Sequence, residues 1–344
     1  RMSFFVAIQV TRIIPEEGPA LDDLKVSTVP APVCGSSSIE VRVKAAGTNF
    51  YDVLMLQGKY QHKPPLPFIP GSEFSGIVSK VGKNVLNSGF NVGDHVLGSS
   101  LVGAYAEIIV TSPAQLSHMP KGMTFEEASM FRSASCTSWA GMVVRAKVQP
   151  GEFVLVHAAA GGVGLTAVQI AKSLGAIVIG TVGSDRKAAI VREAGADYVI
   201  NYTTNKHFAP KIKEITKGRG ADVIYDPVGG DVFDESTRCI AWNGRIIILG
   251  FTSGRIPSMK MNRVLLKGCS IMGLFYGRYG MEEPHIHQQA QAGTERLFLE
   301  GKLKPFIYKT YALEDLGKAL LAIASRETIG KAVISLDQKP ASKL

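Results

Sequence analysis

Apolar and polar positions alternate with a short period through residues 4–110, the pattern of half-buried β-strands. Gly, Pro and Asn residues separate the apolar runs and indicate turns. This pattern predicts strands at Phe4–Val10, Ser38–Ala45, Gly76–Val81 and His95–Gly98. A mostly helical stretch, Phe125–Val148, is expected after them.

From residue 153 the pattern changes to short apolar runs that alternate with amphipathic segments. The runs predict strands at Phe153–His157, Ile177–Gly180, Tyr198–Ile200, Val223–Tyr225, Arg245–Leu249 and Ser270–Met272. The segments between them predict helices at 163–174, 185–194, 206–217 and 231–241. Repeated strand–helix–strand crossovers predict a doubly wound parallel sheet with helices on both faces.

The alternation is lost beyond about residue 275. A helix near 285–300, a strand near 305–310, a helix near 314–325 and a last strand at Ala332–Leu336 are expected there. A chain of 344 residues suits two domains. We expect the last strand to return to the β-rich domain, so that a nucleotide-binding domain at 134–273 is inserted between 1–133 and 274–344.

A glycine-rich turn follows the first strand of the α/β region. Its residues, Ala159-Ala160-Gly161-Gly162-Val163-Gly164, form an A-x-G-x-x-G pattern. In a dinucleotide-binding turn, Gly161 would let the backbone approach a pyrophosphate and Gly164 would let the helix pack closely on the strand. The N–H groups at the helix start would face the anion. The alternative is a glycine-rich turn without a ligand.

The end of the second α/β strand favours NADPH over NADH. An NAD enzyme places an acidic residue about 20 positions after the glycines, and that place falls on 181–183, where no residue is acidic. Ser184, Arg186 and Lys187 instead offer a hydroxyl and two cations, which suit a 2′-phosphate. We expect Asp185 to cap the following helix. The alternative for the two cations is a solvated helix start.

Composition excludes several other classes of protein. The net charge is +9, but the basic residues are scattered and no basic–aromatic motif appears, so nucleic acid is not an expected partner. No apolar run reaches the ~18 residues of a membrane span, and the start of the chain lacks a signal-peptide layout. The four cysteines are widely spaced, which favours reduced thiols over disulfides or a zinc knuckle.

The last three residues, Ser342-Lys343-Leu344, match a peroxisomal address read by an import receptor. They predict a peroxisomal location, with the cytoplasm as the alternative. The alternative is a frayed polar tail in which these three residues match the address by chance.

Seven segments between 47 and 333 together resemble one protein family. They are Gly47–Asp52, Pro70–Gly76, His157–Gly164, Asn201-Tyr202, Asp226–Gly230, Leu249–Phe251 and Gly330–Val333. The chain is similar to zinc-independent medium-chain dehydrogenases/reductases of the NADPH:quinone oxidoreductase group. The resemblance implies a GroES-like β-rich catalytic domain with a doubly wound Rossmann domain inserted in it, and a homodimer joined through the cofactor domains.

The resemblance also implies roles for individual residues. Asn49 matches an asparagine near the nicotinamide ribose, and Tyr60 matches a tyrosine of the active-site cleft. The matching cofactor-binding positions are Asn49, Thr137, Ala160, Gly161, Gly162, Val163, Gly183, Ser184, Lys187, Tyr202, Gly250, Phe251, Phe275, Tyr276 and Lys331. One departure is Leu54, which replaces a second cleft tyrosine of the bacterial quinone reductases and leaves a preference for quinones in doubt.

Zinc relatives of this family place a histidine where this chain has Ser72, and Glu73 stands beside it without a carboxylate partner. Catalytic zinc needs three N, S or O ligands, so no metal is expected. We expect Glu73 to form an ion pair with a basic residue. His285 and His287 have the i, i+2 spacing of a strand-borne metal pair, but a surface loop is the preferred interpretation.

Without a metal, hydrogen bonds must polarise the substrate while the cofactor supplies the hydride. The Asn49 amide, the Tyr60 hydroxyl or a backbone N–H could stabilise negative charge on a substrate oxygen. Alternatively, Asn49 binds only the ribose, and Tyr60 only lines the cleft, without a role in the chemistry. Asp52 is expected to cap its helix.

The predicted activity is a zinc-free NADPH-dependent reduction of a quinone or an α,β-unsaturated carbonyl. The alternatives are a peroxisomal 2-enoyl-CoA reductase, and an NADPH-binding structural or RNA-binding protein with low activity.

Overall fold

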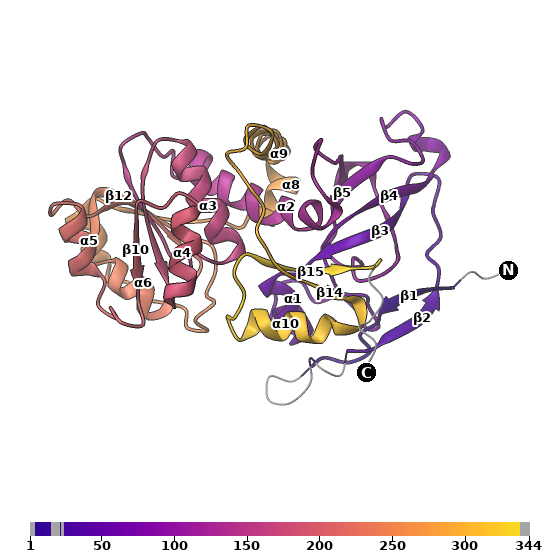
Figure 1. The fold of residues 1–344 in the computed structure, drawn as a ribbon, viewed down its shortest axis with the longest axis horizontal. Coiled ribbons are helices and arrows are strands. Elements are labelled where there is room, and N and C mark those ends of the chain that lie inside the picture. Colours follow the sequence, from indigo (N-terminus) through magenta and orange to yellow (C-terminus); the bar gives the residue numbers. More distant parts are fainter. Residues whose placement is uncertain (1–3, 15–20, 22–23, 338–344) are drawn as a thin grey trace. The chain divides into compact units, whose positions relative to one another are not determined.

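The computed structural model describes residues 4–14, 21 and 24–337, and Ser342-Lys343-Leu344 lies outside them. The chain forms two compact units (Figure 1). The first contains the residues up to Ser133 and those from Pro305 onward, and the second runs from Ala134 to Lys304.

The first unit is built on a seven-stranded sheet in the order β14-β15-β3-β4-β5-β7, with β6 paired to β3. Its strands are β3 (Ile39–Gly47), β4 (Glu73–Val81), β5 (His95–Ser99), β6 (Ile108–Thr111), β7 (Leu116–His118), β14 (Ile307–Ala312) and β15 (Lys331–Ser335). A separate two-stranded sheet holds β1 (Phe4–Ile8) and β2 (Val26–Pro30). Helices α1 (Phe50–Leu56) and α10 (Leu316–Ala324) contribute Leu56 and Leu320 to the core.

The last strand returns to the first unit, as predicted. Val333 of β15 lies opposite Gly47 of β3 in an antiparallel pair. The short turns η1 (Lys83–Val85), η2 (Pro113–Gln115) and η5 (Leu313–Asp315) connect elements of this unit. The β-rich fold formed from both ends of the chain therefore agrees with the sequence pattern.

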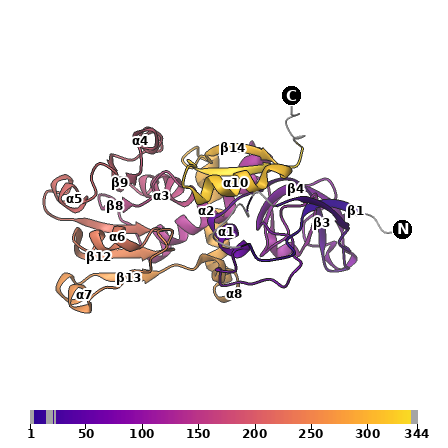
Figure 2. The ribbon, with the colours of Figure 1, turned by 90° about the horizontal axis from the view of Figure 1, so that it is seen from below.

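The second unit is a six-stranded parallel sheet in the order β10-β9-β8-β11-β12-β13. Its strands are β8 (Phe153–Val156), β9 (Ile177–Val182), β10 (Tyr198–Asn201), β11 (Ala221–Asp226), β12 (Ile240–Ile248) and β13 (Ser270–Gly273). The helices between them are α3 (Gly162–Ser173), α4 (Asp185–Glu193), α5 (Ala209–Ile215), α6 (Gly230–Ser236) and α7 (Met261–Lys267), seen from two directions in Figures 1 and 2. The strand order reverses between β8 and β11, the place where doubly wound sheets bind ligands.

The helix expected at 231–241 is shorter than predicted. It ends at Ser236, and β12 begins at Ile240, five residues before the expected start at Arg245. Cys239, Ile240 and Ala241 are apolar and buried, and Ile240 pairs with Ala221 of β11. Burial against the sheet therefore outweighs the helical pattern here.

Residues 274–304 group with the second unit, although we expected them in the first. They include η4 (Tyr276–Arg278), α8 (Tyr279–Glu282) and α9 (Pro284–Leu299). Helix α9 packs on the end of α2 (Phe125–Trp139) and on the π-helix η3 (Ala140–Arg145). A Cβ on Gly293 would lie 2.4 Å from Nε1 of Trp139, so only glycine permits this close packing.

Within the described residues, every helix is too short or too polar to cross a membrane.

Candidate functional site

The glycine-rich turn joins β8 to α3 in the second unit. Gly161 is the N-cap of α3, and Ala158 adopts a left-handed φ of 47°. A Cβ on Gly164 would lie 2.2 Å from the carbonyl oxygen of Ala158, so this position requires glycine. The predicted residues Ala160, Gly161, Gly162 and Val163 thus lie at the start of a 12-residue helix, whose first N–H groups lack intrahelical partners.

His157 supports this turn from within the core. Its Nδ1 lies 2.9 Å from Oγ1 of Thr181 on β9, and its Nε2 lies 2.7 Å from Oγ of Ser236 on α6. Burial lowers the pKa of His157 to about 4, so the ring is neutral at physiological pH. The imidazole therefore links β8 to β9 and α6 without burying a charge.

Four predicted cofactor residues, Gly183, Ser184, Lys187 and Tyr202, follow the ends of β9 and β10. Ser184 is the N-cap of α4, and its Oγ accepts the N–H of Lys187 at 3.3 Å. A Cβ on Gly183 would lie 2.8 Å from the hydroxyl of Tyr202. The prediction that Asp185 caps this helix is wrong, because Ser184 is the cap and Asp185 is the first helical residue.

The other predicted cofactor residues of this unit follow later strands. Gly250 and Phe251 come after β12, and Phe275 and Tyr276 come after β13, so all four lie at the carboxyl ends of parallel strands. Phe275 is 55% exposed, whereas Tyr276 is buried. Thr137 lies apart from these positions in the sequence, on α2.

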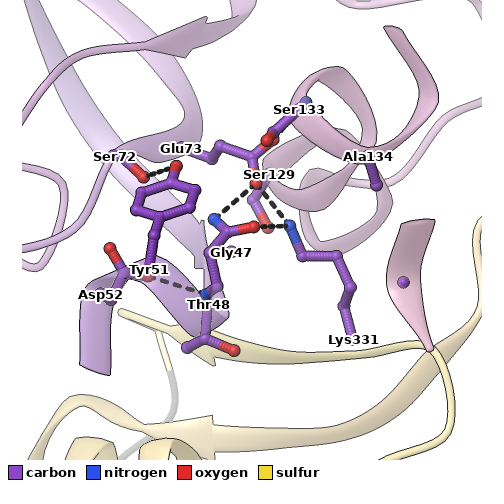
Figure 3. A network of polar contacts seen from close by, with 12 residues as sticks. Gly47, Thr48, Tyr51, Asp52, Ser72, Glu73, Ser129, Ser133, Ala134 and Lys331 are labelled. Atoms are coloured by element: carbon purple, nitrogen blue, oxygen red, sulfur yellow. Dashed lines mark hydrogen bonds and ion pairs between the residues drawn. The ribbon is translucent and has the colours of Figure 1, made fainter. Parts of the chain in front are cut away.

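A buried ion pair organises the first unit (Figure 3). Nζ of Lys331 on β15 lies 2.5 Å from Oε2 of Glu73 on β4, and both side chains are at most 5% exposed. The ion pair predicted for Glu73 is therefore confirmed. The second carboxylate oxygen of Glu73 accepts the N–H of Ser133. Lys331, which the family resemblance places near the cofactor phosphates, has its ammonium engaged within this unit.

The side chain of Asn49 completes this pair. Its Oδ1 accepts a hydrogen bond from Nζ of Lys331 at 2.7 Å, and its Nδ2 donates to Oε2 of Glu73 at 2.9 Å. These contacts fix which end of the amide is the donor. Asn49 therefore has a set orientation at the start of α1.

Asp52 is buried in the first turn of α1. Its Oδ2 accepts the N–H of Asn49 at 2.7 Å and the hydroxyl of Tyr105 at 2.8 Å. The contact with Asn49 confirms that Asp52 caps the helix. Its other oxygen, Oδ1, has no partner among the described residues. Burial raises the pKa of Asp52 to about 7, against the lowering effect of the two hydrogen bonds.

A pair of hydroxyl groups beside this network was not predicted from the sequence. The Tyr51 hydroxyl is hydrogen-bonded to Oγ of Ser72, and the Tyr51 ring stacks on Tyr60 with centroids 5.4 Å apart. Burial, with the charges of Asp52 and Glu73, raises the pKa of Tyr51 well above its usual value. Tyr51 is next to Asp52 in the sequence, but nothing in the sequence pairs it with Ser72.

Zinc does not fit this network. Ser72 is bound to Tyr51, and Glu73 is bound to a lysine ammonium. No group of three His, Cys, Asp or Glu residues within the described parts of the chain could hold a metal ion. His285 and His287 lie on α9 rather than in the expected loop, and His287 stacks on Tyr276.

Two family descriptions match this chain. Residues 35–121 match the alcohol dehydrogenase GroES-like domain, and residues 162–291 match the zinc-binding dehydrogenase family. The second description names a metal, for which the described residues of the first unit offer no group of three His, Cys, Asp or Glu ligands.

Individual relatives define the group more narrowly. A quinone oxidoreductase-like protein 2 homolog of Nematostella vectensis is 41% identical over 307 residues, 88% of this chain and 83% of that protein. A quinone oxidoreductase of Pseudomonas aeruginosa is 34% identical, over 87% of this chain and 91% of that protein. The Escherichia coli quinone oxidoreductase structure, complexed with NADPH, has a TM-score of 0.86 at 31% identity, covering 96% of this chain and 99% of that chain.

The fold and these similarities define an oxidoreductase of the medium-chain dehydrogenase/reductase superfamily. Within it, the chain belongs to the quinone oxidoreductase group. It is an NADPH-dependent, quinone oxidoreductase-like enzyme.

We predict that Lys331→Met lowers the free energy of unfolding by about 3–5 kcal/mol, because Glu73 is left buried without its cation. Adding Glu73→Gln should restore most of the loss. Lys211→Met is the matched control, since the side chains of Lys211 and its partner Glu214 are 50% and 68% exposed and such pairs contribute less than about 1 kcal/mol. Urea unfolding measures all four proteins. Equal losses for Lys331→Met and Lys211→Met would contradict the prediction.

We also predict that stability depends on pH through Asp52. Because the folded pKa of about 7 exceeds the usual value of 3.8, the folded state holds the proton more tightly. Stability therefore falls as pH rises from about 4 through 7. The side chain of the Asp52→Asn variant cannot ionise. As the pH rises from 5 to 8, the free energy of unfolding of this variant should therefore increase relative to that of wild type by on the order of 2–3 kcal/mol. Urea unfolding measures the free energy of unfolding of both proteins across this pH range. The same pH dependence in both would refute the role of Asp52.

Proposed function

We propose that this chain is an NADPH-dependent reductase that transfers hydride to a quinone or an α,β-unsaturated carbonyl without a metal ion. The observation that carries the proposal is the joint position of Gly183, Ser184 and Tyr202 at the ends of the paired strands β9 and β10, with a glycine-rich turn at the end of the neighbouring strand β8. This is the edge of a doubly wound sheet at which dinucleotides bind.

The residues of the second unit fit NADPH. Gly164 permits the close strand–helix packing that leaves the turn open to a pyrophosphate. Ser184 and Lys187 lie where the adenosine ribose of a dinucleotide would be recognised, and a hydroxyl with a cation suits its 2′-phosphate. The E. coli relative is complexed with NADPH, which supports the same choice here.

The first unit supplies neutral hydrogen-bond donors for the substrate. Bound NADPH provides the hydride. Reduction of a conjugated carbonyl places negative charge on its oxygen, and donors aimed at that oxygen stabilise it. The Asn49 amide, held by Lys331 and Glu73, and the hydroxyls of Tyr51 and Tyr60 can donate such bonds. A tyrosine hydroxyl is already protonated at neutral pH, and the raised pKa of Tyr51 strengthens this preference.

We further propose a homodimer formed through the second unit. Strand β13 ends the sheet order, so one of its edges carries no strand among the described residues. Ile271 of β13 is 36% exposed, and Met261, Leu265 and Leu266 of α7 are each more than 70% exposed. An unpaired edge beside apolar side chains suits strand pairing with a second copy.

The activity predicts rapid NADPH oxidation with 1,4-quinones or simple enones, followed in a stopped-flow instrument. Lys187→Ala should raise the KM for NADPH roughly 10- to 100-fold, because a charged hydrogen bond is lost, and change the KM for NADH less than about twofold. Arg192→Ala removes a cation from the other end of α4 and is the control. Equal losses for both cofactors would reject Lys187 as a 2′-phosphate ligand. Turnover only with trans-2-enoyl-CoA would favour the acyl-CoA alternative, and none with any acceptor would refute the proposed activity.

The dimer predicts that Leu265→Glu together with Ile271→Lys yields a monomer of unchanged helical content. Two charges would have to be desolvated in the interface. Light scattering coupled to gel filtration measures the mass of both proteins, and Leu299→Glu, an exposed apolar position on α9, is the control. A wild-type monomer, or a variant that remains dimeric, would refute the proposed interface.

A further inference from the structure

Asp185 poses a problem for an NADPH site. It is the first residue of α4, directly after Ser184 and two residues before Lys187. A carboxylate near this position in NAD-binding folds accepts the 2′-hydroxyl of the ribose and repels a 2′-phosphate. Asp185 is also exposed, so its side chain has room to change rotamer.

Asn201, the last residue of β10, binds this carboxylate. Its Nδ2 donates to Oδ1 of Asp185 at 3.0 Å, and no other partner of the Asp185 side chain is described. The contact joins the start of α4, which follows β9, to the end of β10. These two ends lie side by side because β9 and β10 are paired and parallel. The carboxylate is thus held toward β10.

The orientation of the Asn201 amide is fixed by Thr203. Oδ1 of Asn201 accepts the N–H of Thr203 at 3.0 Å and its hydroxyl at 2.6 Å. The backbone N–H can only donate, so this end of the amide must be the oxygen, and the hydroxyl then donates to it as well. The NH₂ group therefore has to face Asp185, where it meets an acceptor.

The next residue, Tyr202, directly follows the end of β10. Its hydroxyl is against Gly183, directly before Ser184. Two consecutive residues at the end of β10 thus contact the two parts of one site: Asn201 contacts the carboxylate, and Tyr202 lies beside the residues proposed to bind the phosphate.

We propose that Asn201 determines cofactor specificity by holding the Asp185 carboxylate away from the 2′-phosphate. The inference rests on the proposed NADPH site and names a residue that makes it selective. Without the Asn201 amide, the carboxylate is free to turn toward the ribose. There it repels a 2′-phosphate and accepts a hydrogen bond from a 2′-hydroxyl. Asn201 is a positioning residue in this account, since it acts through Asp185.

The test measures binding of 2′,5′-ADP and 5′-AMP, which differ only in the 2′-phosphate, by isothermal titration calorimetry on the full chain. The selectivity is the ratio of the two dissociation constants. Asn201→Ala should reduce the preference for 2′,5′-ADP roughly fivefold at low salt, the size expected for a like charge brought to about 4 Å in water. The reduction should shrink in 0.5 M NaCl.

Two further variants separate this role from a structural one. Asn201→Ala combined with Asp185→Asn should recover the wild-type preference, because the repelling charge is gone. Asn205→Ala is the matched control, since its side chain bonds the Asn201 carbonyl and Thr204 but not Asp185. It should leave the preference unchanged.

Equal weakening of both ligands by Asn201→Ala, or failure of Asp185→Asn to restore the preference, overturns the role of Asn201. A wild-type protein that binds 2′,5′-ADP no better than 5′-AMP refutes the proposed NADPH site itself, and the inference with it.

Discussion

The ammonium of Lys331 and the carboxylate of Glu73 meet in the interior of the first unit, although 258 residues separate them in the chain. Burying either charge alone costs several kcal/mol, so the unit is stable only when β15 and β4 bring both together. The pair also fixes Asn49 through one hydrogen bond from Lys331 and one to Glu73. A stability constraint and the orientation of a proposed substrate-binding amide therefore depend on the same contact.

The second unit shapes its site largely through the backbone. Gly164 permits close packing of α3, and the neutral ring of His157 links three elements beneath the turn. Side-chain chemistry enters at the ends of β9 and β10, where Ser184, Lys187 and Tyr202 are proposed to distinguish one nicotinamide cofactor from the other. In the proposed function the turn binds the dinucleotide, and a few side chains at the strand ends select which one.

The sequence pattern predicted the features that depend on local periodicity. The alternation from residue 153 gave the parallel sheet, and the terminal apolar run gave the returning strand β15. Features that depend on contacts between distant parts of the chain were harder to predict from the sequence. Glu73 was expected to find a cation, but only the fold identifies Lys331. The bond between Tyr51 and Ser72, and the position of α9 in the second unit, depend on tertiary packing that no local pattern encodes.

We propose that hydride passes from NADPH to a conjugated carbonyl at a site built from hydrogen-bond donors rather than zinc. The decisive measurement follows deuterium from [4,4-²H₂]NADPH into the product of enone reduction, in buffer treated with a metal chelator. We expect mass spectrometry to find one deuterium on the β-carbon of the saturated product, at a rate that the chelator does not change. A product without deuterium, or activity lost to the chelator and restored by zinc, would contradict hydride transfer by a site without a metal.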